Sequence, residues 1–220
     1  GPGDAKGQCY PAHVEVLRGD MDKALQDYSM AQSLEPTNPR IYVARSAIYL
    51  QLGDYRSALK DLNVAIDLRP RDPGQFLNRG IVHFNLGSYK EAIDDYSSAL
   101  KFDPRSYAAL NNRCLTRAIR EEELEAAHAD CLAAQEIRSN DPFTLMNLGL
   151  IALKRQNYAE AIALYDAVLD ADSRWARALF GRGIARARSG KGTLALEDMN
   201  AAKALLPNVE TEFASYGLKP

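Results

Sequence analysis

The amino-acid sequence predicts an all-α protein of about six helical hairpins, with a short C-terminal helix that caps the last hairpin. The first observation is a period of 34 residues, which separates Gly19 from Gly53 and Gly53 from Gly87. The second is an alanine that recurs with the same step, from Ala24 to Ala58 and onward. The third is a hydrophobic content of 46%, which is enough for a continuous core. Such a period is typical of stacked helical repeats that cover one another's apolar faces.

The period divides most of the chain into consecutive repeats. We expect them at residues 5–38, 39–72, 73–106, 107–141, 142–175 and 176–209, the fourth with one inserted residue. The predicted helix pairs are 39–52 with 55–68, 73–86 with 89–102, 107–120 with 124–137, 142–155 with 158–171, and 176–189 with 192–206. In the first repeat, residues 20–34 form a strong second helix, whereas Gly7 and Pro11 predict a frayed first helix.

The two ends of the chain are expected to differ from the repeats. Residues 1–4 read as an expression scar and a disordered N-terminus, because Gly1-Pro2-Gly3 is typical of a cleaved tag. Residues 210–220 read as a capping tail whose short helix ends at Gly217. We therefore expect residues 5–209 to form a single domain.

Residue types at fixed places of the repeat explain why each unit is a hairpin. Small residues at the eighth and twentieth places let two antiparallel helices approach closely, and large residues at the twenty-fourth place fill the space beside them. Proline at the thirty-second place ends the second helix. The eighth places are Ala12, Ser46, Gly80, Cys114, Gly149 and Gly183, and the prolines are Pro36, Pro70, Pro104 and Pro207.

This pattern resembles the tetratricopeptide repeat family, and the resemblance covers residues from about Ala5 to Val209. It implies a right-handed α-solenoid of about six helix-turn-helix repeats. It also implies a concave groove, lined by the first helix of each repeat, in which a segment of another protein binds.

Two places of the repeat change together. The seventh place is arginine in four repeats, and the twenty-third place of the same repeats is aspartate. The pairs are Arg45 with Asp61, Arg79 with Asp95, Arg113 with Asp130, and Arg182 with Asp198, whereas the fifth repeat has Leu148 and Leu164. Because an unpaired buried charge is costly, we expect internal ion pairs rather than ligand-binding arginines.

The sixth place carries a recurrent asparagine, at Asn78, Asn112 and Asn147. The resemblance places it on the groove side, where an amide that both donates and accepts hydrogen bonds can bind the main chain of a peptide. The alternative is that asparagine is simply tolerated on a helix surface. The other expected groove residues are Leu77, Ile81, Phe84, Asn85, Asn111, Leu115, Phe143, Met146, Leu150, Phe180 and Ile184.

The C-terminal end of the expected groove is basic, with Lys154, Arg177 and Arg188. Such a cluster favours an acidic segment or a terminal carboxylate of a partner. The alternative is an ordinary solvated helix face.

Two of the three cysteines occupy paired places of one hairpin, Cys114 at the eighth and Cys131 at the twenty-fourth. Either the two sulfurs are bonded, or a larger and a smaller side chain compensate each other. A disulfide would indicate an exported, periplasmic location, and free thiols a cytoplasmic one.

Composition argues against several classes of function. The formal net charge of −2 gives no field for collecting nucleic acid, and no apolar run is long enough to insert in a membrane. The cysteines and histidines show no metal-ligand spacing, and no phosphate loop or nucleophile motif occurs, so we expect no metal, no cofactor and no enzyme.

The sequence therefore predicts a non-catalytic scaffold that binds a peptide or helix of a partner protein in its groove. The alternative is a structural subunit in which the groove or a terminal hairpin contacts a second copy of the chain and assembles a cell-envelope or other multiprotein complex.

Overall fold

The computed structural model describes residues 21–121 and 123–219, and within these residues every regular element is a helix. The helices are α2 (Met21–Leu34), α3 (Pro39–Gln51), α4 (Tyr55–Leu68), α5 (Pro73–Asn85), α6 (Tyr89–Phe102), α7 (Tyr107–Arg120), α8 (Leu124–Ile137), α9 (Pro142–Lys154), α10 (Tyr158–Ala171), α11 (Ala176–Arg188), α12 (Gly192–Leu205) and α13 (Val209–Ser215). The predicted helix pairs and capping helix are confirmed. The expected scar and frayed first helix lie outside the described residues.

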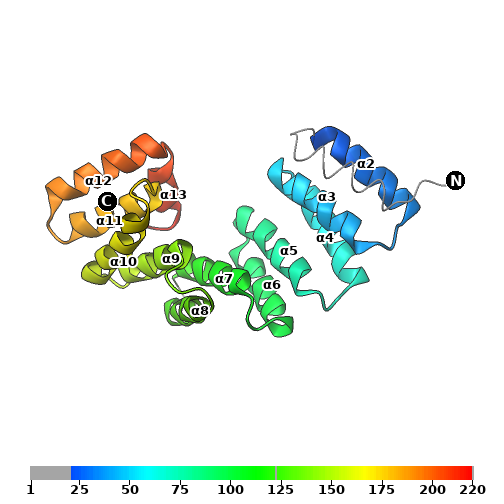
Figure 1. Cartoon of the computed structure of the whole chain (residues 1–220), viewed down its shortest axis with the longest axis horizontal. Coiled ribbons are helices and arrows are strands. Elements are labelled where there is room, and N and C mark those ends of the chain that lie inside the picture. The colour runs from blue at the N-terminus through cyan, green and yellow to red at the C-terminus, as the bar shows by residue number, and fades with distance from the viewer. Residues whose placement is uncertain (1–20, 122, 220) are drawn as a thin grey trace. The chain divides into compact units, whose positions relative to one another are not determined.

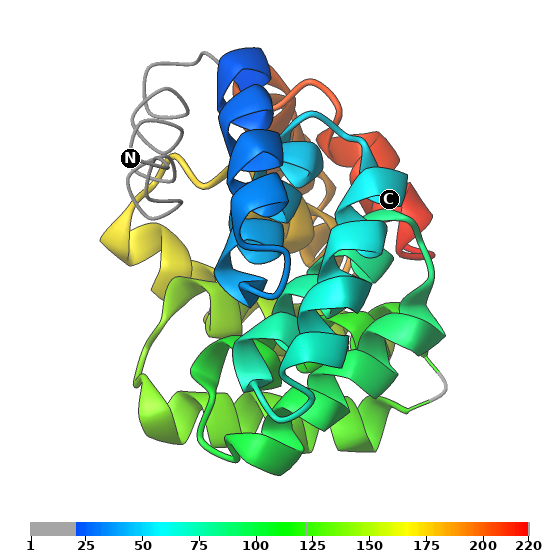
Figure 2. The ribbon, with the colours of Figure 1, turned by 90° about the vertical axis from the view of Figure 1, so that its right-hand side faces the viewer.

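The chain forms two compact units, residues 1–104 (unit 1) and 105–220 (unit 2). In the described part of unit 1, α2 to α6 pack in chain order, each against the next (Figure 1 and Figure 2). In unit 2, α7 to α12 form three hairpins, and α13 packs against α11 and α12. First helices of consecutive repeats also touch within unit 2, as α7 does with α9 and α9 with α11.

Short polar residues set the helix boundaries. Asn38, Asp72 and Asp141 each accept a backbone N–H at the start of α3, α5 and α9, and each is followed by a proline whose fixed φ suits the first helical position. The turn inside a hairpin needs a residue with positive φ, which Gly53 supplies at +74°. Glu121 takes the corresponding left-handed conformation in the fourth repeat, with φ of 62°.

The core of each hairpin is the predicted contact between a small eighth residue and a large twenty-fourth residue. A Cβ atom on Gly80 would lie 2.6 Å from the ring of Tyr96, and one on Gly149 would lie 2.8 Å from the ring of Tyr165. Both rings are buried, so neither can move aside. The two helices can therefore approach this closely only where the eighth residue is small.

The predicted ion pairs are confirmed in all four repeats. Each arginine donates two hydrogen bonds to the two oxygens of its aspartate, with Nε–Oδ2 distances of 2.7 to 2.9 Å. Asp61, Asp95, Asp130 and Asp198 are all buried. In the fifth repeat Leu148 is buried in place of the arginine.

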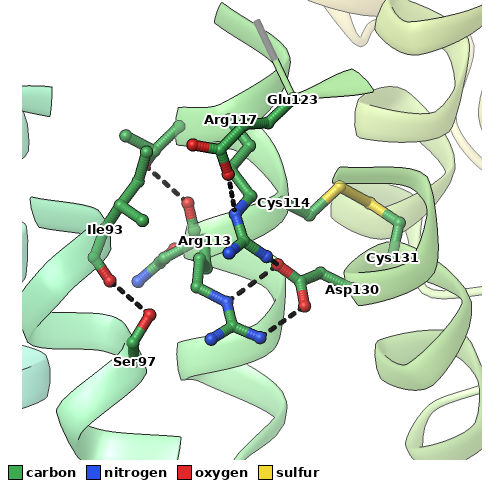
Figure 3. A network of polar contacts seen from close by, with 10 residues as sticks. Ile93, Ser97, Arg113, Cys114, Arg117, Glu123, Asp130 and Cys131 are labelled. Carbon is green, nitrogen blue, oxygen red and sulfur yellow. Dashed lines mark hydrogen bonds and ion pairs between the residues drawn. A yellow bond between two sulfur atoms is a disulfide. The ribbon is translucent and has the colours of Figure 1, made fainter. Parts of the chain in front are cut away.

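The sequence did not predict that in two of the four repeats a second arginine also binds the aspartate. Arg117 donates to Asp130 across 2.7 Å, as Figure 3 shows beside Arg113, and Arg186 donates to Asp198 across 2.7 Å. Both bases stand four residues after the first arginine, one helical turn further on. We call each arginine–aspartate ion pair a strut. In the fourth and sixth repeats the strut is a cluster of three residues, because it includes the second arginine.

Replacing Gly149 with alanine tests the close approach. The added methyl group meets the buried Tyr165 ring, so we expect Gly149→Ala to lower the free energy of unfolding by about 1–3 kcal/mol. Gly192→Ala is the matched control in the same unit, because nothing lies within 4 Å of its Cβ position, and it should be neutral or stabilising by up to about 1 kcal/mol. Urea denaturation followed by circular dichroism measures both, and equal effects would contradict this account.

Replacing one or both members of a strut tests the ion pairs. Arg45→Leu leaves Asp61 buried and unpaired, so we expect a loss of about 3–5 kcal/mol. Arg45→Leu combined with Asp61→Leu copies the fifth repeat and should restore stability to within about 1 kcal/mol of the parent. Arg56→Leu, on the exposed side of α4, is the control. A double variant as unstable as the single one would refute the pairing argument.

Candidate functional site

The first helices of the second and third repeats, α3 and α5, enclose a depression of about 360 Å³ on the surface of unit 1. Its lining includes Asn78, one of the three asparagines at the sixth place of the repeat, which is half-buried. The rest of the lining is Pro39, Arg40, Val43, Ala44, Arg69, Asp72, Gly74 and Gln75. Apolar, amide and cationic groups therefore meet in one hollow.

Gln75 gives this depression an unused acceptor. The side chain is only 3% exposed, and its Oε1 atom has no hydrogen-bond partner among the described residues. The oxygen itself has almost no accessible surface, so an N–H group of a ligand would reach it only after the Gln75 side chain turns, and the new bond would then remove the cost of an unsatisfied buried acceptor. The exposed Arg40 and Arg69 make the rim basic, and Asp72 is occupied in capping α5.

The other predicted groove residues of unit 1 also lie on α5. Leu77, Ile81 and Phe84 are half-buried, and the Phe84 ring contacts that of Tyr89 at 5.6 Å between centroids. Asn85 is exposed and donates to the carbonyl of Ile81. These four residues are therefore partly accessible, and Asn85 is tied to its own helix.

In unit 2 a polar network joins α7 to α9. Asn147 donates to the side-chain and main-chain oxygens of Asn111 at 3.0 and 3.3 Å, and Thr144 donates to the Asn111 side chain at 3.2 Å. Tyr107 donates to Asp141. Burial raises the pKa of the Tyr107 hydroxyl to about 12, and the bond to Asp141 adds to this shift. Asn147 is buried in this network, while Asn112 is half-buried.

The predicted apolar groove residues of unit 2 fall into two groups. Leu115 and Met146 are half-buried, and Phe143 is 53% exposed, with its ring 5.2 Å from that of Trp175. Leu150, Phe180 and Ile184 are buried. The first group is accessible to a ligand, whereas the second belongs to the core of the unit as it stands.

The three predicted basic residues all contact one segment of the chain, which we call the C-terminal segment (residues 209–219). Lys154 Nζ donates to the carbonyl of Tyr216 at 2.7 Å, and Arg188 donates to the carbonyl of Lys219 at 2.9 Å. Arg177 Nε donates to Glu212 Oε1 at 2.7 Å. The structure therefore brings these residues together, around the chain's own residues.

The structure joins Cys114 and Cys131 in a disulfide between α7 and α8 (Figure 3). Both residues are completely buried, one position after Arg113 and Asp130 respectively. The fourth hairpin thus has a covalent bond at the place where the third and fifth hairpins have a glycine and an aromatic ring.

The sequence did not predict two of the residues that line the depression of unit 1. Gln75 gave no signal because its place is not part of the repeat pattern, and the basic Arg69 follows α4 rather than a first helix. The C-terminal segment was predicted as a cap over the last hairpin, but its reach to Lys154 was not predicted. Among residues 21–121 and 123–219, no cluster of three metal-ligating side chains and no helix able to span a membrane is found.

Comparison with protein families gives three matches along the chain. Models described as tetratricopeptide repeat match residues 75–106 and 146–210, and a model described as TPR repeat matches residues 47–87. The comparison with curated proteins gives no match.

Solved structures share the fold. A tetratricopeptide repeat protein from Parabacteroides merdae aligns over 96% of this chain and 87% of its own, at 19% identity and a TM-score of 0.80. PilW, a type IV pilus biogenesis factor, aligns over 95% and 98% at 17% identity and 0.82. YrrB, a TPR protein with an unusual peptide-binding site, aligns over 87% and 98% at 19% identity and 0.62. At these identities the likeness concerns the fold alone.

Reduction tests the disulfide. Its sequence separation of 17 predicts that reduction lowers the free energy of unfolding by about 3 kcal/mol, since the open chain regains loop entropy. Urea denaturation with and without dithiothreitol measures this, and a Cys114→Ala, Cys131→Ala variant should not respond to the reductant. In non-reducing conditions the denatured protein should show one reactive thiol, and three would contradict the bond.

Proposed function

Because the chain belongs to the tetratricopeptide repeat family, whose members bind other proteins, we propose that it is a scaffold that holds a peptide or helical segment of a partner protein against its first helices. The observation that carries the proposal is the depression of unit 1, where Asn78 and the unpartnered Gln75 oxygen adjoin the apolar Val43 and Ala44. A main chain offers both N–H and C=O groups to such amides, whatever its sequence.

The charge of the rim suggests which segments bind. Arg40 and Arg69 are exposed at the depression, and a carboxylate placed between them gains charge-assisted hydrogen bonds. Because exposed charges are screened by salt, we expect this preference to weaken as ionic strength rises. The proposed ligand is therefore an extended segment with an acidic residue and small apolar neighbours.

Selection of peptides from a random display library on the wild-type chain tests this function. We expect Asn78→Ala to lower the affinity for the selected peptides roughly tenfold, which corresponds to the loss of about one well-made hydrogen bond. Gln51→Ala, at the exposed C-terminal end of α3, is the matched control and should leave affinity unchanged. Peptides that bind both variants equally would place the site elsewhere.

Self-assembly is the competing outcome, and the exposed Phe143 beside Trp175 is the apolar surface that would mediate it. Light scattering at increasing concentration separates the two. A monomer throughout supports peptide binding, and a dimer lost on Phe143→Glu supports assembly instead.

A further inference from the structure

The C-terminal segment covers an apolar surface of unit 2. Val209, Phe213 and Leu218 are buried, and the Phe213 ring lies 5.1 Å from that of Phe180, which is completely buried. α13 packs against α11 and α12, as Figure 1 shows at the C-terminal end of the chain. An aromatic side chain of this segment is therefore the anchor of the contact.

The polar contacts of the same segment are those that a bound peptide would make. Lys154 and Arg188 donate to two main-chain carbonyls, which any sequence supplies. Arg177 pairs with Glu212, which directly precedes the aromatic anchor, and Lys203 pairs with Glu210 at 2.6 Å. The site therefore selects an acidic residue followed by an aromatic one, and holds the backbone beyond them.

One donor of the site also has contacts outside the segment. The Lys154 side chain is 2% exposed, and its ammonium group also donates to the carbonyl of Ile119 at 3.3 Å and pairs with Glu121. Removal of the Tyr216 carbonyl would leave the cation still held in place by these two groups. A preorganised donor of this kind lowers the cost of binding a new main chain.

The segment has little helical stability of its own. α13 has seven residues, too few for an isolated helix to be stable, and its N-cap residue Asn208 makes no side-chain cap. Arg177 is 52% exposed in its side chain, so its pair with Glu212 adds little. The segment therefore depends on its contacts with α11 and α12 to keep its form.

We propose that the surface under residues 209–219 is a second peptide site, filled here by the chain's own residues, and that a partner segment with an acidic residue before an aromatic one displaces them. This inference rests on the proposed function, since it names a further site and the chemistry of its ligand.

A fluorescent peptide with the sequence of residues 208–219 is the probe, and anisotropy with the full chain is the measurement. Phe213→Ala removes the anchor and should bind the probe at least tenfold more tightly than the wild type, whose site is occupied. Thr211→Ala, on the exposed side of α13, is the matched control and should behave like the wild type. A probe carrying Phe213→Ala should lose binding, whereas one carrying Glu212→Ala should bind only a few-fold less tightly, because its partner Arg177 is exposed. Equal binding to wild type and Phe213→Ala, or no binding, overturns the proposal.

A second variant guards against misfolding of Phe213→Ala. Glu212→Lys places two cations together at the pair with Arg177 and should also open the site, whereas adding Arg177→Glu should close it again. This inference alone would be refuted if the probe failed to bind while peptides selected on the unit 1 depression still lost affinity on Asn78→Ala. A wild-type dimer that Phe213→Ala abolishes would make the occupant a second copy, which also overturns it.

Discussion

The size match between the eighth and twenty-fourth residues of each hairpin is the constraint on which the other contacts depend. The five described hairpins meet it with four kinds of pair: Ser46 with Leu62, Gly80 with Tyr96 and Gly149 with Tyr165, Cys114 with Cys131, and Gly183 with Met199. The arginine and aspartate of the strut stand at the directly preceding places. Their bidentate contact therefore exists because the packing pair has already brought the helices to that separation. This order explains why the fifth hairpin keeps its glycine and tyrosine but dispenses with the strut.

The struts also connect one hairpin to the one before it. Arg45 reaches Ser29 on α2, Arg79 reaches Asn63 on α4, and Arg182 reaches Asp166 on α10. The fifth repeat, with Leu148, lacks this link. In its place the network of Asn111, Asn147 and Thr144 ties α9 to α7. We infer that Asn147, at the sixth place of this repeat, has a structural role, because it makes the polar connection between neighbouring hairpins that the arginine makes in other repeats.

Helices, hairpins and struts could be predicted because all of them are encoded within one 34-residue period. The accessibility of groove residues could not be predicted, because it depends on segments from other repeats. Lys154 contacts Tyr216, 62 positions away, and Asn147 contacts Asn111, 36 positions away. Periodicity assigns a residue to a face of its helix but does not say what covers that face. Phe180 illustrates the difference, since its place in the repeat is a groove place and yet it is completely buried.

Equivalent places therefore do not have equivalent roles in the two units. In unit 1 the depression beside Asn78 offers an unpartnered amide oxygen and exposed arginines, so a ligand there would gain contacts without displacing any. In unit 2 a ligand must first displace the C-terminal segment, so its apparent affinity is the intrinsic affinity multiplied by the fraction of molecules in which that segment is open.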